Sequence, residues 1–138
     1  IGMTMDAARA DLVQAVLEGV AFAIRDSVEV ARSLGIEINK SKICGGGARS
    51  PLWKRIFANV LNCELESLAC EQGPGMGGAM LAMVACGEYP DVQSCCNKLV
   101  EVASIVKPEA SLAAKYETRY QQFRKIYPAV KALFPEIQ

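Results

Sequence analysis

A run of three glycines at positions 45–47 is the part of this sequence whose residue types best suit binding chemistry. The glycines follow a short β-like segment that ends at Cys44, and they precede a predicted helix that begins near Leu52. A turn without Cβ atoms can adopt positive φ angles and lets a ligand or another backbone approach closely. Ligands of open α/β sheets bind beyond the carboxyl ends of strands, where backbone N–H groups favour anionic or hydrogen-bonding ligands. A plain tight connection is the other interpretation of the same glycines.

Side chains for acid–base or nucleophilic catalysis are hard to find in this chain. It contains no histidine, so neither a Ser/His nor a Cys/His arrangement can be drawn, and its carboxylates are scattered. Glu71 is the most site-like carboxylate because it adjoins a second glycine-rich stretch, and capping of a helix start is its competing role. Glu18 is expected beside the apolar stripe of a helix, and Asp26 on a solvated face. No general base is apparent from the residue types.

The composition narrows the class of protein. At 138 residues the chain is one domain's worth or less, and 51% of its residues are hydrophobic, which is enough for a globular core. The formal net charge is zero, so there is no electrostatic case for nucleic acid or an anionic membrane as a partner. No apolar run reaches the length of a membrane-spanning helix. The chain begins with Ile1 rather than Met, and we expect it to be a piece of a longer polypeptide.

Six cysteines raise the question of disulfides or a metal site. They are Cys44, Cys63, Cys70, Cys86, Cys95 and Cys96. No Cys-x-x-Cys pair and no histidine is present, so no metal site is predicted. The two adjacent cysteines cannot readily bridge each other. We therefore expect free, mostly buried thiols in a protein of the reducing cytoplasm.

Helices and strands are expected to alternate along the first part of the chain. The predicted elements are a helix over 7–34, a strand over 42–44 that could start at 38, a helix over 52–61, a strand over 64–69, and helices over 75–86, from 90 to about 103, and over 111–125, with a short helix at the end. Thr4 or Asp6 is expected to cap the first helix, and Gly35 and Gly87 to end the first and third. Pro128 is expected as the first residue of the last helix.

The first helix carries an apolar stripe that predicts its buried face. The stripe comprises Leu12, Val16, Gly19, Val20, Ala23, Ile24 and Val28, which recur at intervals of three and four residues. In the middle of this helix Gly19 costs about 1 kcal/mol relative to alanine. The close approach of another backbone would explain the glycine, and a merely tolerated glycine is the alternative.

The alternation of elements predicts an α/β fold with about two parallel strands and several helices, joined by a right-handed crossover. Two strands are too few for a stable sheet, so the sequence itself indicates that strands are missing. The strand before the glycines would then have one bare edge, which invites pairing with another chain. We therefore predict that the isolated chain forms homo-oligomers through the edge at residues 40–44.

Three segments carry a resemblance to a known family. They are RADLVQAVLEGVAF at 9–22, GGGARSPLW at 45–53 with Ile56 and ANVL at 58–61, and EQGPGMGGAMLA at 71–82. In this order they resemble the long helix before the glycine strand, the adenosine-binding motif and the later glycine-rich helix start of the FGGY carbohydrate kinases. The terminal aromatic pattern of Tyr116, Tyr120, Phe123 and Tyr127 also fits. The resemblance covers essentially the whole chain but only the last part of such a kinase, and it is closest to the xylulokinase branch.

The resemblance implies a fold and an activity. The fold is a partial ribonuclease-H-like, actin-like ATPase domain, and residues 1–138 are the C-terminal portion of the nucleotide-binding C-terminal domain. The catalytic Asp, most sugar contacts and much of the phosphate–Mg²⁺ machinery belong to an N-terminal domain that is absent here. Because phosphoryl transfer depends on positioning and charge neutralisation, half of the cleft is not expected to catalyse.

The resemblance also implies ligands. The intact parent would use ATP, yielding ADP, with Mg²⁺, and would convert D-xylulose to D-xylulose 5-phosphate. Gluconate, ribulose or glycerol are the alternative substrates within the family, since the sugar-reading residues are absent. Two further readings stay open at this point. One is a non-catalytic nucleotide-binding or assembly module of the actin-like superfamily, and the other is a plain α/β interaction fragment whose glycine turn is structural.

Binding residues follow from the motif positions. The resemblance places Gly45, Gly46 and Gly47 against the ribose and the α-phosphate, and Ala48 and Ser50 at the border of the adenine. The same motif includes Arg49, for which solvation is an equal alternative, and the later segment places Gly75 and Met76 on the far side of the adenine pocket. For Trp53 we expect a core position rather than stacking on adenine, because it shares a helical face with Ile56, Phe57 and Val60.

Overall fold

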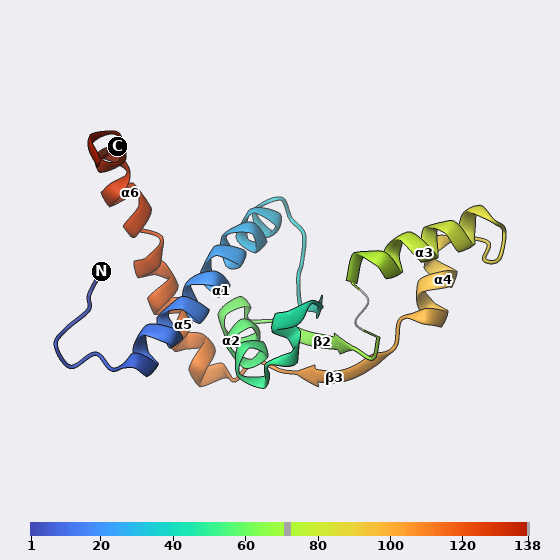
Figure 1. Ribbon diagram of the computed structural model, residues 1–138, viewed down its shortest axis with the longest axis horizontal. Helices are drawn as coiled ribbons and strands as arrows, with labels where there is room; N and C mark the ends of the chain where they lie inside the picture. The colour runs from blue at the N-terminus through green and yellow to red at the C-terminus, as the bar shows by residue number, and fades with distance from the viewer. Residues whose placement is uncertain (71–72, 138) are drawn as a thin grey trace.

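The glycine turn lies between a strand and a helix in the computed structural model of the protein, which describes residues 1–70 and 73–137. The elements are α1 (Arg9–Ser33), β1 (Lys40–Ile43), a 3₁₀ turn (Gly46–Arg49), α2 (Pro51–Leu61), β2 (Glu64–Leu68), α3 (Gly73–Ala85), α4 (Val92–Leu99), β3 (Val102–Val106), α5 (Ala110–Phe123), α6 (Ile126–Val130), a second 3₁₀ turn (Lys131–Leu133) and α7 (Phe134–Ile137). Figure 1 shows an elongated molecule with α1, α2 and α5 packed together, the sheet in the middle, and α3 and α4 as an arm at the far end.

The sheet has three strands in the order β1-β2-β3, so the expectation of about two strands was too low. The expected parallel pairing is present between β1 and β2, whereas β2 and β3 are antiparallel. A helix was expected up to about residue 103, but α4 ends at Leu99, and Val100 already has an extended backbone. The following run is rich in β-branched residues, and its pairing with β2 outweighs the helical tendency of the preceding segment.

Two clusters of buried side chains form the core. One consists of Ala21, Phe22, Ile56, Val60 and Tyr120, with Leu17, Trp53, Phe57, Tyr116 and Phe123 packed against it. The other consists of Ala58, Leu61, Cys63 and Leu65, with Val28, Ile43, Phe57 and Val106 packed against it. The first joins α1, α2 and α5, the second joins α2 to the sheet, and Phe57 contacts both. The helix that follows the glycine turn is therefore the central element of the core.

The buried face of α1 is not the one that the apolar stripe predicted. Leu12, Val16, Val20 and Ile24 are 42–66% exposed, while Ala21 and Phe22 on the neighbouring face are 0% and 5% exposed. The helix is apolar on both faces, so its periodicity could not tell which one α2 and α5 cover. A Cβ on Gly19 would meet nothing within 4 Å, so no backbone approaches that glycine among the described residues.

Local signals at helix ends were predicted with mixed success. The residue before α1 is Ala8 rather than Thr4 or Asp6, and its N–H donates to the Asp11 carboxylate at 2.9 Å. Gly35 and Gly87 follow α1 and α3 with φ of 82° and 80°, as expected of glycines that end helices. In α6, Pro128 is the third residue rather than the first.

The cysteines are free, as expected, but they are not mostly buried. Cys63 and Cys95 are buried and Cys96 is half-buried, whereas the other three are exposed. Burial raises the pKa of the Cys63 thiol above its ordinary value. The exposed ones lie after β1, after β2 and after α3, where the chain leaves the packed elements.

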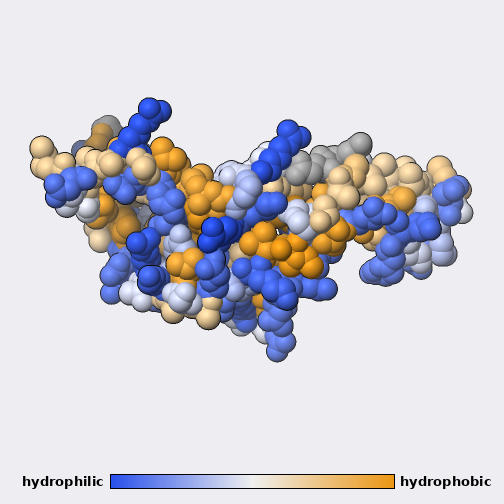
Figure 2. Space-filling model, turned by 90° about the horizontal axis from the view of Figure 1, so that it is seen from below, coloured by the Kyte–Doolittle hydropathy of each residue, from blue (hydrophilic) through white to orange (hydrophobic). Residues whose placement is uncertain are grey.

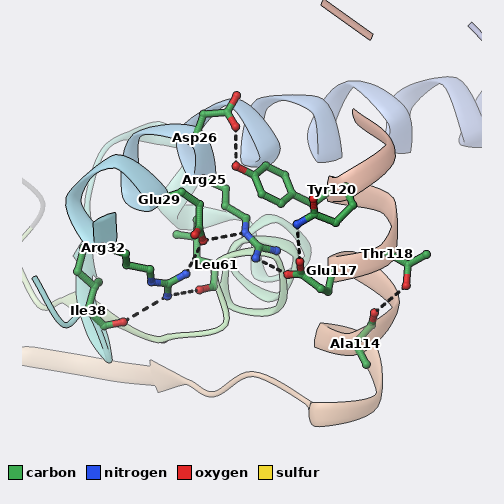
Figure 3. A network of polar contacts seen from close by, with 11 residues as sticks. Arg25, Asp26, Glu29, Arg32, Ile38, Leu61, Ala114, Glu117, Thr118 and Tyr120 are labelled. Atoms are coloured by element: carbon green, nitrogen blue, oxygen red, sulfur yellow. Dashed lines mark hydrogen bonds and ion pairs between the residues drawn. The ribbon is translucent and has the colours of Figure 1, made fainter. Parts of the chain in front are cut away.

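Two arginines of α1 tie this helix to its neighbours, Arg25 to α5 and Arg32 to the segments on either side of the glycine turn (Figure 3). Arg25 is buried and forms ion pairs with Glu29 and with Glu117 of α5. Arg32 donates to the Leu61 carbonyl at the end of α2 at 2.8 Å, and to the Ile38 carbonyl just before β1. These bonds fix the positions of both the strand that enters the turn and the helix that leaves it.

The edge of β1 opposite β2 has no strand partner among the described residues, as the sequence predicted. Three of the four β1 residues are exposed, and the Lys42 ammonium donates to the Glu66 carboxylate of β2 at 2.9 Å. Hydrophobic side chains also reach the surface over the middle of the molecule, where the sheet lies (Figure 2). In β3, Val102 and Ile105 are 41% and 50% exposed. Among the described residues, the outer edge of β1 is thus left bare, and the sheet carries exposed apolar residues.

Candidate functional site

The glycine turn begins where the chain leaves β1 at Ile43. Gly45 has a φ of 89°, a backbone conformation that favours glycine. Its carbonyl then accepts the N–H of Ala48 at 3.0 Å, and the carbonyl of Gly47 accepts the N–H of Ser50 at 3.1 Å. These two bonds close a short 3₁₀ turn that directs the chain into α2. The turn stands at the carboxyl end of a parallel strand, which is the position that the sequence predicted.

The three glycines are not equivalent in space. A Cβ on Gly45 or on Gly46 would meet no atom within 4 Å. A Cβ on Gly47 would lie 2.4 Å from Cζ3 and 2.5 Å from Cε3 of Trp53, which is closer than real contacts allow. Gly45 and Gly46 therefore face open space in which a ligand can lie against the backbone. Gly47 is a glycine because the indole ring of Trp53 occupies the space beside it.

The start of α2 is capped by a residue of the predicted site. The Ser50 hydroxyl accepts the N–H of Trp53 at 3.3 Å, and Pro51 is the first helical residue, as is usual at helix starts. A serine hydroxyl can donate one hydrogen bond while it accepts another, so this cap does not prevent Ser50 from donating to a ligand. The positive end of the helix dipole also favours an anionic group near this turn.

The other two residues of the turn are placed differently from each other. Ala48 is only 2% exposed, so its methyl group is packed into the protein interior. Arg49 is exposed at the end of the 3₁₀ turn. Contact between either residue and a ligand stays a prediction. Of the two, Arg49 is the exposed residue and Ala48 the buried one.

The second glycine-rich segment follows the neighbouring strand. Because β1 and β2 are parallel, the glycine turn and the start of α3 both come after carboxyl ends at the same edge of the sheet. Gly75 is exposed and Met76 is half-buried in the first turn of α3, and a Cβ on Gly75 would meet nothing within 4 Å. Their contact with the same ligand as the glycine turn stays a prediction. Glu71 and its neighbour Gln72 lie outside the described residues.

Lys54 is a residue that the sequence analysis did not single out. From the first turn of α2 its ammonium reaches across to the Ser67 hydroxyl near the end of β2, at 3.1 Å. This places a half-buried cation between the helix that leaves the glycine turn and the neighbouring strand. A lysine on a helix is usually a solvated residue, so nothing in the sequence marked it. Only the pairing of β1 with β2 brings Ser67 within its reach.

The charged groups near the sheet edge are held in ion pairs rather than arranged for proton transfer. The hydrogen bond from Lys42 lowers the pKa of the Glu66 carboxyl, so this acid stays ionised and paired. Glu18 is buried and accepts from Tyr116 at 3.0 Å and from Arg119 at 3.1 Å, far from the turn at the α1–α5 contact. Within the described residues no three potential metal ligands cluster together. Among the described residues, the turn has an open surface but no carboxylate placed to act as a general base there.

Trp53 packs in the core, as the helical face predicted. It lies half-buried against the cluster of α1, α2 and α5, and its ring centroid is 5.6 Å from that of Phe57. Its indole nitrogen is buried and has no hydrogen-bond partner among the described residues.

No helix in the described part of the chain combines the length and hydrophobicity needed to cross a membrane.

Comparison with known proteins gives a consistent result. The model of the FGGY family of carbohydrate kinases, C-terminal domain, matches residues 1–86. A xylulose kinase of Staphylococcus epidermidis is 31% identical over 99% of this chain, but the match covers only 28% of that protein.

Solved structures show the same pattern. A xyloylose kinase from Brucella ovis has 36% identity and a TM-score of 0.84, with 96% of this chain and 27% of that chain covered. A gluconate kinase from Lactobacillus acidophilus has a TM-score of 0.90, with 100% of this chain and 28% of that chain covered. Because its identity is only 20%, this likeness shows the fold alone. The expected α/β, actin-like ATPase fold is thereby confirmed, and the chain spans little more than a quarter of the proteins it matches.

Proposed function

This chain belongs to the FGGY family of carbohydrate kinases, and we propose that it is the C-terminal portion of the nucleotide-binding domain of an ATP-dependent sugar kinase. The matched relatives are more than three times as long, so we place the catalytic N-terminal domain outside the 138 residues. In this proposal the chain supplies the adenosine-binding wall of the cleft. It does not catalyse alone.

One observation carries the nucleotide assignment. The turn at Gly45 and Gly46 presents a bare backbone to open space, at the carboxyl end of a parallel strand and beside the capped start of α2. Such a surface suits the ribose and the α-phosphate, because no side chain keeps them from the backbone and the helix dipole favours the negative charge. The hydroxyl of Ser50 and the exposed Arg49 complete the turn on the adenine side, and Lys54 adds positive charge at the same edge.

Binding and positioning are the work that these residues can do. Phosphoryl transfer needs an aligned nucleotide and neutralised phosphate charge, and little covalent chemistry from the protein. The described residues hold no cluster of three potential metal ligands. In our proposal the Mg²⁺ ion is held by the nucleotide phosphates and by the rest of the protein. The base that accepts the proton of the sugar hydroxyl likewise lies in the N-terminal domain.

D-xylulose is the proposed sugar, with its terminal hydroxyl phosphorylated. This choice is supported by the names of two relatives described above, a xylulose kinase at 31% identity and a xyloylose kinase at 36% identity. The resemblance to the family motif points the same way, since Gly47 in its third glycine position favours the xylulokinase type. Gluconate, ribulose and glycerol are the competing substrates. As an ATP-dependent enzyme of sugar metabolism, the parent is placed in the cytoplasm.

The decisive experiment measures ADP release by the full-length parent with ATP and one sugar at a time. D-xylulose, D-ribulose, D-gluconate and glycerol are compared side by side, with the 138-residue chain alone as the control. We expect a clear preference for D-xylulose and no activity of the chain alone. Activity on another sugar would overturn the substrate and keep the nucleotide assignment. No activity with any of the four would favour a non-catalytic nucleotide-binding or assembly module.

A further inference from the structure

The contact between Gly47 and Trp53 is the closest that any glycine Cβ would make in the described part of the chain. The other glycines have no atom within 4 Å of the Cβ position, whereas at Gly47 the nearest three atoms all belong to the six-membered ring of Trp53. The backbone of the same residue is also bound to the turn, because the main-chain N–H of Trp53 donates to the Ser50 hydroxyl. Trp53 thus touches the turn at two points.

Trp53 is also anchored in the core on its other side. It packs against the cluster formed by Ile56, Val60 and Tyr120, and beside Phe57. Its indole nitrogen makes no hydrogen bond with the described residues, so the N–H group does not explain why a tryptophan stands here. What the residue supplies is the breadth of a two-ring side chain, which spans the distance from the core to the backbone of Gly47.

We propose that Trp53 is the positioning residue of the glycine turn. Its indole ring contacts Gly47 and sets the distance of the turn from the core. It thereby sets where the exposed backbone of Gly45 and Gly46 meets the nucleotide. The part of this inference that concerns the nucleotide rests on the proposed function. The part that concerns the position of the turn does not. Trp53 acts through Gly47 and has no contact with the ligand.

Three glycines in one turn then have three separate causes. Gly45 is required by its backbone conformation, Gly46 by the space that the ligand needs, and Gly47 by the ring of Trp53. A side chain at Gly46 would obstruct the ligand directly. A side chain at Gly47 would instead push the turn away from the core or displace the ring, since packed interiors yield little to added atoms.

The test is a double-mutant cycle in the full-length parent, with Gly47→Ala, Trp53→Phe and the two combined. Phenylalanine keeps an aromatic ring in the core but lacks the second ring whose carbons touch Gly47. We expect Gly47→Ala to raise the KM for ATP about tenfold, with little change in the KM for the sugar. Trp53→Phe in the Gly47→Ala background should bring the KM for ATP back toward that of the parent.

Two matched controls separate this mechanism from general damage. Gly46→Ala should not be rescued by Trp53→Phe, because its added methyl group points into open space rather than at the ring. Leu65→Ala weakens the second core cluster, which does not include Trp53, and its effect should simply add to that of Gly47→Ala. Additive effects of Gly47→Ala and Trp53→Phe on both the KM for ATP and the thermal midpoint would overturn the proposal.

The thermal midpoint keeps this inference distinguishable from the proposed function. If the parent turns over no ATP with any sugar, the kinase assignment fails. The coupling between Gly47→Ala and Trp53→Phe in thermal unfolding then still decides whether the ring positions the turn. We expect the double variant to unfold at a higher temperature than the sum of the two single effects would give.

Discussion

Tyr120 offers the sharpest test of how α1 and α5 are held together. Its side chain is 1% exposed, and its hydroxyl donates to the Asp26 carboxylate of α1 at 2.6 Å. The guanidinium of Arg25 lies over its ring, 4.1 Å from the centroid. Burial first, and then the hydrogen bond to Asp26, raise the pKa of Tyr120 from 10.0 to about 12. Replacement by phenylalanine keeps the packing and removes both the hydrogen bond and the titrating group.

The effect of Tyr120→Phe should change sign with pH. At neutral pH the variant loses one hydrogen bond, which costs about 1 kcal/mol because Asp26 is exposed and can be solvated instead. Above pH 10 the unfolded tyrosine loses its proton while the folded one keeps it until about pH 12. The stability that Tyr120 contributes is therefore complete below pH 10 and declines as the pH rises. The decline amounts to about 1.4 kcal/mol at pH 11 and about 2.7 kcal/mol once the folded group also ionises.

Urea unfolding of the protein with Tyr120 and of its Tyr120→Phe variant, measured from pH 7 to pH 11, checks this reasoning. The two curves of unfolding free energy against pH should converge above pH 10 and cross at about pH 10.7. At that pH the stability lost because unfolded Tyr120 ionises equals the free energy of the hydrogen bond that the variant lacks. Asp26→Asn is the control, because it alters the acceptor and leaves the tyrosine buried, so most of the alkaline decline should remain. A constant difference between the tyrosine and phenylalanine proteins across this range would refute the assignment of a raised pKa to Tyr120.

Three further predictions concern the turn and the sheet edge. In the parent, Gly46→Val should raise the KM for ATP strongly because a side chain would occupy the ribose space, and unchanged ATP kinetics would remove Gly46 from the site. Trp53→Ala should lower the free energy of unfolding by about 3 kcal/mol, the lower end for a large aromatic because the ring is only half-buried. An equally stable variant with poor ATP affinity would instead point to direct stacking on the nucleotide. The isolated chain should self-associate through the bare edge at residues 40–44, and a strictly monomeric light-scattering mass at high concentration would contradict this.

The strand–turn–helix unit of the candidate site was largely predictable because its signals are local, whereas the binding roles of its residues stay a prediction. Three glycines after a strand, a serine that caps a helix and a proline at its first position specify a strand–turn–helix unit within ten residues, and the structure contains it. The sequence could not distinguish the roles of Gly46 and Gly47, since both read as residues without a side chain. That distinction depends on where the ring of Trp53 lies, six residues further on. Lys54 was missed for the same kind of reason, because its partner Ser67 is on another element.

The fold was predictable as far as single elements and the parallel pairing, and less so beyond them. A helix was predicted up to about residue 103, over the start of β3, because residues 102–106 become a strand only by pairing with β2. On α1 the apolar stripe at Leu12, Val16 and Val20 was expected to be buried and is exposed. Hydrogen bonds between distant elements, such as that from Arg32 to the Leu61 carbonyl, could not be predicted from the sequence.

The sequence by itself determined the period of each helix, the class of the fold and the turn at which a ligand can meet bare backbone. These depend on residues within a few positions of one another, where steric limits and capping act directly. Only the tertiary structure decided which face of α1 is buried, which strand completes the sheet and which of the three glycines faces a ring. The first two are settled by contacts between segments far apart in the chain, whose free energy exceeds the local preference of either segment. The third is settled by where the core holds the ring of Trp53, six residues after Gly47.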